Sequence, residues 1–349
     1  MKKNLLGVLL LLCSSVAWAG ELKLWYSKPA KDWTEALPVG NSRLGAMVYG
    51  GTGREELQLN EETFWAGGPY DNNNTNALYV LPVVRSLIFQ GKTREAQRLV
   101  DANFLAHKDG MSYLTMGSLF LDFPGHEEAT EFYRDLNIED ATATTRYKVD
   151  GVTYIRRVFA SFTDSVIVLR LQADKAGALA FTVSYDAPLK HEVSTEGDLL
   201  TITCEGRDQE GVKAALRAEC RVKVVSDGQT TAEGKKLEVT GATEATLYLS
   251  AATNYVNYHD VSGDAAARAD RCLQRAVQIP YKKALENHVA YYRKLFGRVQ
   301  LDLGETAAAS KETTLRIRDF SQGNDPSLAA LLFQYGRYLL ISSSQPSGQ

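Results

Sequence analysis

The stretch AALRAECRVKVV, residues 214–225, decides the fold class of this 349-residue chain. Its apolar and charged residues alternate, so that the even-numbered residues from Leu216 to Val224 share one face. Period-two alternation is typical of a strand with one buried and one solvated face. Further strand patterns at residues 166–169, 199–204 and 246–251 are separated by turn residues, and residues 166–169 are expected to be buried on both sides. Many short strands with intervening turns favour a large antiparallel sandwich over a βαβ fold.

Helical patterns interrupt and then follow these strands. Apolar residues spaced by three and four predict helices over residues 83–90, 93–103 and 263–277. Ile279-Pro280 ends the third of these, and Tyr281 begins another helix in which His288 is interpreted as a packed core residue. We predict a short strand at residues 299–303 and a small, polar linker at residues 304–311.

The last predicted helix covers residues 327–343, with Asp325 as its cap and Pro326 in its first turn. Its apolar stripe is expected at Leu328, Leu331, Leu332, Tyr335 and Leu339. A single amphipathic helix cannot bury such a stripe alone. We therefore expect it to pack on elements that follow Gln349, which would make the chain part of a longer protein.

The first nineteen residues have the pattern of a secretory signal peptide. Lys2 and Lys3 precede an apolar run from Leu5 to Leu12, and Ala17-Trp18-Ala19 forms a cleavage signal. The apolar run is too short to span a bilayer. We expect an exported protein, periplasmic or secreted, cleaved after Ala19; processing as a lipoprotein at Cys13 is the less favoured alternative, because Leu12 precedes that cysteine.

Charge and cysteine content narrow the function classes. The formal net charge is −3 and there is no basic tract, which argues against nucleic acid or anionic lipid as a partner and favours neutral substrates. Three cysteines remain after cleavage, Cys204, Cys220 and Cys272. Cys204 and Cys220 lie on consecutive strand-like segments and either face each other or stay unpaired as small apolar residues.

Two neighbouring segments carry an unusual density of aromatic, amide and glycine residues. They are WTEALPVGNSRLGA, residues 33–46, and LQLNEETFWAGGPYD, residues 57–71. Aromatic faces pack on the apolar side of a sugar ring, while amide and guanidinium groups hydrogen-bond its hydroxyls. The alternative is a structural turn cluster in which Trp33 and Trp65 are buried.

These two segments resemble the N-terminal domain of glycoside hydrolase family 95. The resemblance continues through the helix pair, residues 113–117, the strand at 133–136 and residues 157–161, and ends at residues 333–344, so it spans nearly the whole mature chain. The chain departs from the family pattern at three positions: Ser42 replaces a usual Gly, Val158 an often-found Glu, and Gln345 a usual Arg.

The resemblance implies a mainly β fold, a large antiparallel β-supersandwich followed by a helical linker and the first helix of an (α/α)6 barrel. We expect the sandwich at residues 20–277, the linker at 278–311 and the start of the barrel at 312–349. The family's best-known activity, inverting hydrolysis of 1,2-linked α-L-fucose, implies a fucosylated oligosaccharide as substrate and catalytic residues beyond Gln349, in the remaining catalytic barrel of the same protein. The alternatives are a non-catalytic carbohydrate-binding or structural sandwich, and the same fold acting on α-L-galactosides.

Within the chain, a loop lent to the sugar pocket is the candidate site. Its residues are Asn41, Arg43, Asn60, Glu61 and Trp65. The acid pairs Glu55-Glu56 and Glu61-Glu62 do not make a hydrolytic pair, because neighbours in a strand point to opposite faces. The five histidines lack metal-ligand spacing, so neither a metal nor a cofactor is expected. Arg337 and Tyr338 of the last helix either face a barrel interior or serve helix packing.

Overall fold

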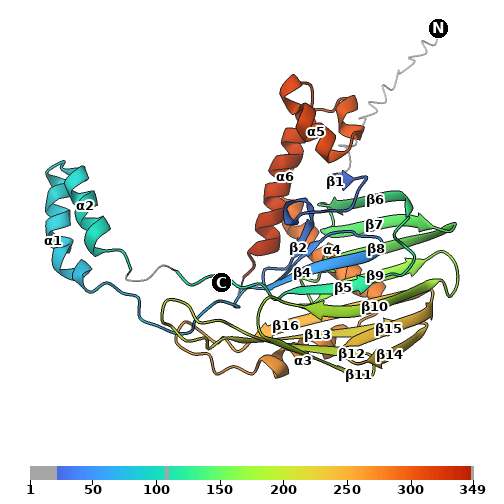
Figure 1. Cartoon of the computed structure of the whole chain (residues 1–349). Coiled ribbons are helices and arrows are strands. Elements are labelled where there is room, and N and C mark those ends of the chain that lie inside the picture. The colour runs from blue at the N-terminus through green and yellow to red at the C-terminus, as the bar shows by residue number, and fades with distance from the viewer. Residues whose placement is uncertain (1–21, 107–109, 347–349) are drawn as a thin grey trace, which may run out of the picture.

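The computed structural model describes residues 22–106 and 110–346, so the predicted signal peptide with Cys13 lies outside the described part (Figure 1). Two antiparallel sheets lie face to face, as the period-two patterns predict. The larger one has nine strands in the order β1-β6-β7-β8-β9-β16-β13-β12-β11 among these residues. Their bounds, in that order, are Lys23–Tyr26, Thr130–Asn137, Thr142–Val149, Val152–Ala160, Ile167–Ala173, Glu244–Thr253, Arg217–Ser226, Leu199–Glu205 and His191–Glu196.

The second sheet has seven strands in the described residues, in the order β14-β15-β10-β5-β4-β3-β2. Their bounds, in that order, are Gln229–Glu233, Lys236–Ala242, Leu179–Asp186, Ser118–Asp122, Arg54–Glu61, Leu44–Val48 and Leu37–Gly40. The apolar residues of both inner faces form one continuous core. The predicted mainly β sandwich is therefore confirmed.

Strand β13 has the predicted alternation of buried and charged residues, but its charged face is not exposed to solvent as expected. Ala218, Cys220, Val222 and Val224 are almost completely buried between the sheets. The opposite face is not simply solvated, because helix α3 (Ala265–Ala276) lies across it. Glu219 is buried there, and Arg221 donates to Asp270 of α3 at 2.5 Å. A charged face on a strand can thus be covered by a helix that supplies ionic partners.

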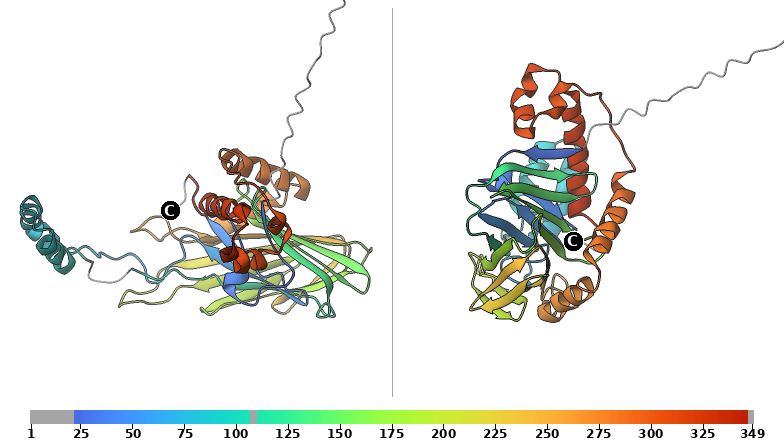
Figure 2. Two further views of the ribbon diagram at one scale, coloured as in Figure 1. Left: turned by 90° about the horizontal axis from the view of Figure 1, so that it is seen from above. Right: turned by 90° about the vertical axis from the view of Figure 1, so that its right-hand side faces the viewer.

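Strand β9 is buried on both sides, as its continuous apolar run predicts. Ile167 and Leu169 belong to the core between the sheets, while Val166 and Val168 belong to a second cluster outside the larger sheet. That cluster includes residues of α3 and of α4 (Tyr281–Phe296). Figure 2 shows both helices along the same outer side of the sandwich. His288 is 1% exposed and contacts the carbonyls of Asp140 and Ala141, so its prediction as a core residue is confirmed.

Helices α1 (Asn76–Phe89) and α2 (Thr93–Asn103) form a hairpin that extends away from the sandwich (Figure 1). The predicted pair is confirmed, but α1 begins seven residues earlier than residue 83 and continues through Pro82. The apolar residues of α1 are not confined to one face. Leu78, Tyr79 and Phe89 are 73%, 79% and 89% exposed.

The C-terminal region contains the 3-10 turn η2 (Ala307–Ser310), α5 (Thr313–Asp319), η3 (Phe320–Gln322) and α6 (Pro326–Ser343); a further turn, η1 (Trp33–Glu35), precedes β2. The cap prediction for α6 is confirmed, since the Asp325 side chain accepts from the Leu328 amide. The predicted strand at residues 299–303 is wrong: this segment has no regular secondary structure and pairs with no strand among the described residues. Its Val299 carbonyl accepts hydrogen bonds from Gln334 and Arg337 of α6 instead of from another strand.

The buried stripe of α6 differs in part from the expected one: Leu328, Leu331 and Tyr335 pack against the core of this chain's own sandwich, so the expectation that the stripe packs on elements beyond Gln349 is wrong for these residues. Ala330, Leu331, Gln334, Tyr338 and Ser342 are buried, whereas Leu332 and Leu339 are 70% and 40% exposed. The helix is rotated because Tyr338 reaches between α4 and β2, where its hydroxyl donates to the Pro38 carbonyl at 2.6 Å. Arg337 lies over the Phe296 ring of α4. Of the two alternatives for Arg337 and Tyr338, helix packing is the one that the structure bears out.

The three described cysteines are unpaired, and Cys204 and Cys220 are buried, so the unpaired alternative holds. Burial raises the pKa of both thiols, which keeps them protonated. No helix within residues 22–106 and 110–346 is long and apolar enough to cross a membrane.

Candidate functional site

The turn between β2 and β3 carries two of the predicted binding residues, Asn41 and Arg43. The Asn41 amide donates to the Ser161 carbonyl at 2.8 Å, and its oxygen accepts from the Leu44 amide at 2.8 Å. Arg43 donates to the carbonyls of Ala251 and Ser165 at 2.6 and 2.9 Å. The polar atoms of both side chains are therefore engaged in tying this turn of the smaller sheet to the larger sheet.

Glu61 lies beneath the same turn, at the end of β4. Its carboxylate accepts from the Thr63 amide and hydroxyl at 2.8 and 2.7 Å and lies 3.9 Å from the Arg43 guanidinium. Burial raises the pKa of the Glu61 carboxyl above its ordinary value, although the Thr63 hydrogen bonds and Arg43 oppose the shift. Glu61 is thus a buried acceptor that shapes the chain from β4 into the following loop.

The two acid pairs face opposite sides, as expected for strand neighbours. Glu55 is completely buried and pairs with Arg156 at 3.2 Å, whereas Glu56 accepts from the Ser118 hydroxyl on the other face. Glu61 is buried and Glu62 is not. The buried members are hydrogen-bond acceptors rather than solvated acids, and neither pair offers two carboxylates across a sugar.

Asn60 lies in a small cavity of about 200 Å³ between the β2–β3 turn and the end of α6. Tyr113, Tyr338 and Leu339 also line it. Ser42, where the family pattern has Gly, borders this cavity with a positive φ of 76°. Its amide donates to the Ser342 carbonyl at 2.6 Å, so the turn and the last turn of α6 are bonded directly.

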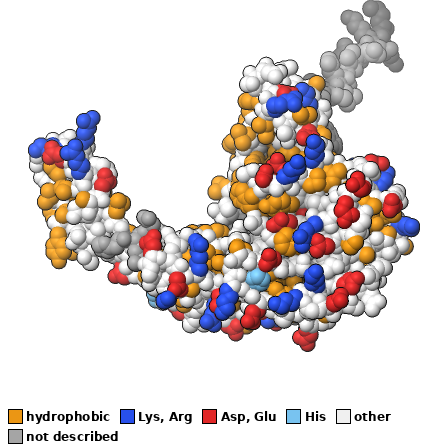
Figure 3. Space-filling model, in the orientation of Figure 1, with side chains coloured by type: hydrophobic (Ala, Val, Ile, Leu, Met, Phe, Trp, Pro, Cys, Tyr) orange, Lys and Arg blue, Asp and Glu red, His pale blue; other side chains and the backbone are white. Residues whose placement is uncertain are grey.

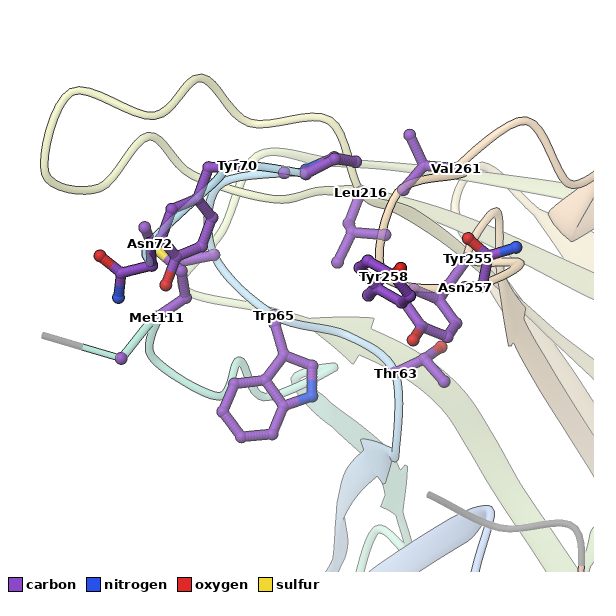
Figure 4. Close-up of a pocket in the computed structure, with 14 residues that line it drawn as sticks. Thr63, Trp65, Tyr70, Asn72, Met111, Leu216, Tyr255, Asn257, Tyr258 and Val261 are labelled. Atoms are coloured by element: carbon purple, nitrogen blue, oxygen red, sulfur yellow. The ribbon is translucent and has the colours of Figure 1, made fainter. Parts of the chain in front are cut away.

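Trp65 alone of the five predicted residues lines the more aromatic cavity, of about 460 Å³ (Figure 4). The indole is 39% exposed, donates to the Glu62 carbonyl at 2.9 Å and packs edge-on against Tyr113 with ring centroids 5.0 Å apart. Trp33 is 55% exposed. The turn-cluster alternative, in which both tryptophans are buried, is therefore wrong on that point.

The cavity combines three segments that are distant in sequence. Figure 4 shows Tyr70, Asn72 and Met111 on one side, Tyr255, Asn257 and Tyr258 on the other, and Trp65 between them. The loop after β16 that supplies Tyr255 and Tyr258 was not predicted. Its sequence NYVNYH, residues 254–259, carries the same aromatic and amide composition as the predicted segments and was the available signal.

The structure thus divides the predicted site. Asn41, Arg43 and Glu61 meet around one turn, Asn60 lies in the small cavity, and Trp65 lies in the aromatic cavity. A role of these residues in substrate binding stays a prediction. No group of three or more His, Cys, Asp or Glu side chains suited to a metal occurs in the part of the chain that the structure describes.

Comparison with known families matches two consecutive parts of the chain. Residues 24–258 match "Glycosyl hydrolase family 65, N-terminal domain", and residues 280–349 match "Glycosyl hydrolase family 95 catalytic domain". The first match covers the two sheets and the aromatic cavity up to Tyr258. The second begins at α4 and includes α6.

Three curated relatives are similar over nearly all of the chain. "Alpha-L-fucosidase 2" of Arabidopsis thaliana is 35% identical over 94% of this chain and 43% of its own length. "Probable alpha-fucosidase A" of Aspergillus niger is 28% identical over 96% of this chain and 45% of its own length. The protein of the same name from Aspergillus oryzae is 27% identical over 97% of this chain and 49% of its own length.

The chain therefore spans less than half the length of each of these relatives. The chain belongs to the glycosyl hydrolases: residues 24–258 are a family 65 N-terminal domain, and they are followed from residue 280 by sequence that matches the family 95 catalytic domain.

Proposed function

We propose that this chain is the N-terminal portion of an exported, inverting α-L-fucosidase that hydrolyses fucosylated glycans. The observation that carries the proposal is the 35% identity to "Alpha-L-fucosidase 2" of Arabidopsis thaliana over 94% of the chain. In this proposal the sandwich supports the catalytic domain, and residues beyond Gln349 supply the acid and the water-activating groups that inversion requires.

Two exposed apolar surfaces support the proposed role as a partner of a catalytic domain. One is on α1, where Leu78, Tyr79 and Phe89 are exposed, and the other is on α6, where Leu332 and Leu340 are 70% and 64% exposed. Figure 3 shows hydrophobic side chains over the hairpin and around α6, on either side of an open hollow. Apolar patches of this kind favour burial against another domain.

The test compares the 349-residue chain with the protein translated from the complete reading frame of its gene. With 2′-fucosyllactose, we expect the complete protein to release fucose and the 349-residue chain to release none. Proton NMR at early times should show the β anomer, because inversion converts the α linkage. Fucose release by the 349-residue chain alone would contradict the proposal, as would faster release of L-galactose from the matching α-L-galactoside.

Export is tested separately. N-terminal sequencing of the protein recovered from the periplasm or medium is expected to begin at Gly20. An intact N-terminus in a cytosolic fraction, or a lipid-modified Cys13, would contradict simple signal-peptide cleavage.

A second candidate function is a non-catalytic carbohydrate-binding sandwich, and the open aromatic cavity favours it. It differs from the first in one measurable respect: the protein from the complete reading frame would bind the glycan without hydrolysing it.

A further inference from the structure

The aromatic cavity between the loops after β4 and β16 has an uncharged lining. Aromatic, aliphatic, amide and hydroxyl groups and glycine backbone form it, and within residues 22–106 and 110–346 none of its lining residues is Asp, Glu, Lys, Arg or His. An uncharged wall does not attract an ionic ligand, and it cannot compensate the free-energy cost of removing such a ligand from water. Its size, about 460 Å³, lies within the range of small-molecule sites.

The wall that carries Trp65 is fixed before any ligand arrives. The Ala66 amide donates to the Ser112 carbonyl, and the Gly67 amide donates to the Arg207 carbonyl, at 2.9 and 2.8 Å. Gly67 has a φ of 68°, and a Cβ on Gly68 would lie 2.6 Å from that of Ala215. Both positions therefore require glycine, and the loop that holds the indole is packed closely against neighbouring backbone.

The opposite wall is fixed as well. In the turn after β16, the amides of Val256 and Asn257 donate to the Asp260 carbonyl at 2.9 and 3.1 Å. The Asn254 amide group bridges the carbonyls of Ala215 and Val261 at 3.0 and 2.8 Å. Because these bonds already hold the backbone of both walls, a ligand that enters has mainly side chains left to order, which lowers the entropic cost of binding.

Rings and hydroxyls between these walls are exposed, although Tyr258 also makes a T-shaped contact with His259 at 4.4 Å between ring centroids. Tyr258 is 81% exposed and Trp65 is 39% exposed. Within the described residues, the hydroxyls of Tyr70, Tyr255 and Tyr258 make no hydrogen bond, unlike the buried tyrosines of the core, such as Tyr292 and Tyr338, which donate to carbonyls. Flat apolar rings next to unengaged hydroxyls match a molecule with one apolar face and a rim of hydroxyls.

We propose that this cavity is a binding subsite for a neutral pyranose of the glycan, one other than the sugar that is cleaved. The sugar stacks on the rings of Trp65 and Tyr258, and tyrosine hydroxyls and the Asn257 amide bond its hydroxyl groups. Among the described residues, none that line the cavity carries a carboxylic acid to protonate a glycosidic oxygen, so in this proposal the cavity positions the substrate and does not cleave it. The subsite rests on the proposed function for the identity of the glycan, but not for the chemistry of binding.

The test measures binding of lactose and of 2′-fucosyllactose to the full 349-residue chain by titration with NMR detection. We expect dissociation constants in the millimolar range for both sugars. Tyr258→Ala should weaken both by about three- to tenfold, because it removes one stacking face. Tyr258→Phe should bind within about twofold of the unmodified chain, since the ring remains.

Tyr79→Ala is the matched control, because Tyr79 is 79% exposed on α1 and outside the cavity. It should leave both affinities unchanged. The proposal is overturned if neither sugar binds in the millimolar range, if Tyr79→Ala weakens binding as much as Tyr258→Ala does, or if the Phe and Ala variants lose equally. Trp65→Ala is a second, independent test. It should weaken the binding of both sugars while the far-ultraviolet circular dichroism spectrum stays unchanged, which shows that the fold is retained.

The two proposals fail in different ways. Weakened lactose binding in Tyr258→Ala, combined with no fucose release by the protein from the complete reading frame, removes the fucosidase assignment and leaves the subsite. If the complete protein releases fucose and its KM is the same with and without Tyr258→Ala, the fucosidase assignment is supported and the subsite is overturned.

Discussion

The turn around Asn41 and Arg43 and the loop around Trp65 have similar compositions, yet the structure uses them in opposite ways. In the turn, side-chain amide and guanidinium groups are bonded to backbone groups of β3, of β16 and of the loop between β8 and β9. In the loop, backbone groups make the bonds, and the aromatic face stays open. Polar groups that a fold has already engaged are poor candidates for a ligand, whereas rings held by backbone bonds are good ones.

The largest expected effect concerns the turn. Arg43→Ala removes two charge-assisted hydrogen bonds to the carbonyls of Ala251 and Ser165, each contributing about 2 kcal/mol. We expect the free energy of unfolding to fall by about 4 kcal/mol, measured by urea denaturation. Arg271→Ala is the control, since Arg271 is exposed, lines a surface pocket together with Arg43, and should change stability by less than about 0.5 kcal/mol. Equal effects of the two variants would break the distinction between engaged and available groups.

The second prediction compares a buried histidine ring with an exposed one and uses pH to tell them apart. Burial lowers the pKa of His288 to about 4, so the folded chain holds a neutral ring that the unfolded chain protonates near its ordinary value of 6.5. Because the unfolded state binds the proton first, stability should fall as pH decreases from 6.5 towards 4, by about 3 kcal/mol at most. His288→Gln should flatten this slope, whereas His259→Gln, at an exposed position, should not. Denaturation midpoints across this pH range provide the measurement.

The smallest effect concerns Ser42, which departs from the glycine of the family pattern. Its φ of 76° is a conformation that side chains with a Cβ adopt at a cost of about 1 kcal/mol. Ser42→Gly should therefore raise the free energy of unfolding by about 1 kcal/mol, although the added freedom of the unfolded chain reduces the gain. Ser344→Gly, at a φ of −137°, should lower it or leave it unchanged. A loss of stability in Ser42→Gly would mean that the serine side chain contributes more to this turn than its backbone conformation costs.

Local patterns sufficed for most of the fold. The alternation in β13, the continuous apolar run of β9 and the Asp325-Pro326 start of α6 each reflect a short-range cause that the sequence contains. The segment at residues 299–303 has a strand composition but pairs with no strand among the described residues. Whether a segment pairs depends also on a neighbouring strand, which the segment's own sequence does not contain. The rotation of α6 has a similar origin, because the space for Tyr338 is made by Pro38 and α4.

The candidate site was less accessible to sequence reasoning for the same reason. Trp65 was recognised from its own segment, but Tyr258 lies almost two hundred residues further along the chain and is brought near it by the pairing of β16 in the sandwich. Arg43 was expected to face a ligand because of its residue type. Its engagement depends on the carbonyl of Ala251 in the other sheet and on that of Ser165 in the loop before β9, which no local pattern reveals.

The bond from Tyr338 to Pro38 joins residues 300 positions apart, and β2, which holds Pro38, is an edge strand. At ordinary rates of translation, α6 leaves the ribosome on the order of 15 to 60 seconds after β2. During that interval β2 presents an uncovered edge of the kind that recruits other strands. A product truncated before Pro326 would lack this contact on the β2 edge, and it is therefore expected to aggregate there more readily than the 349-residue chain.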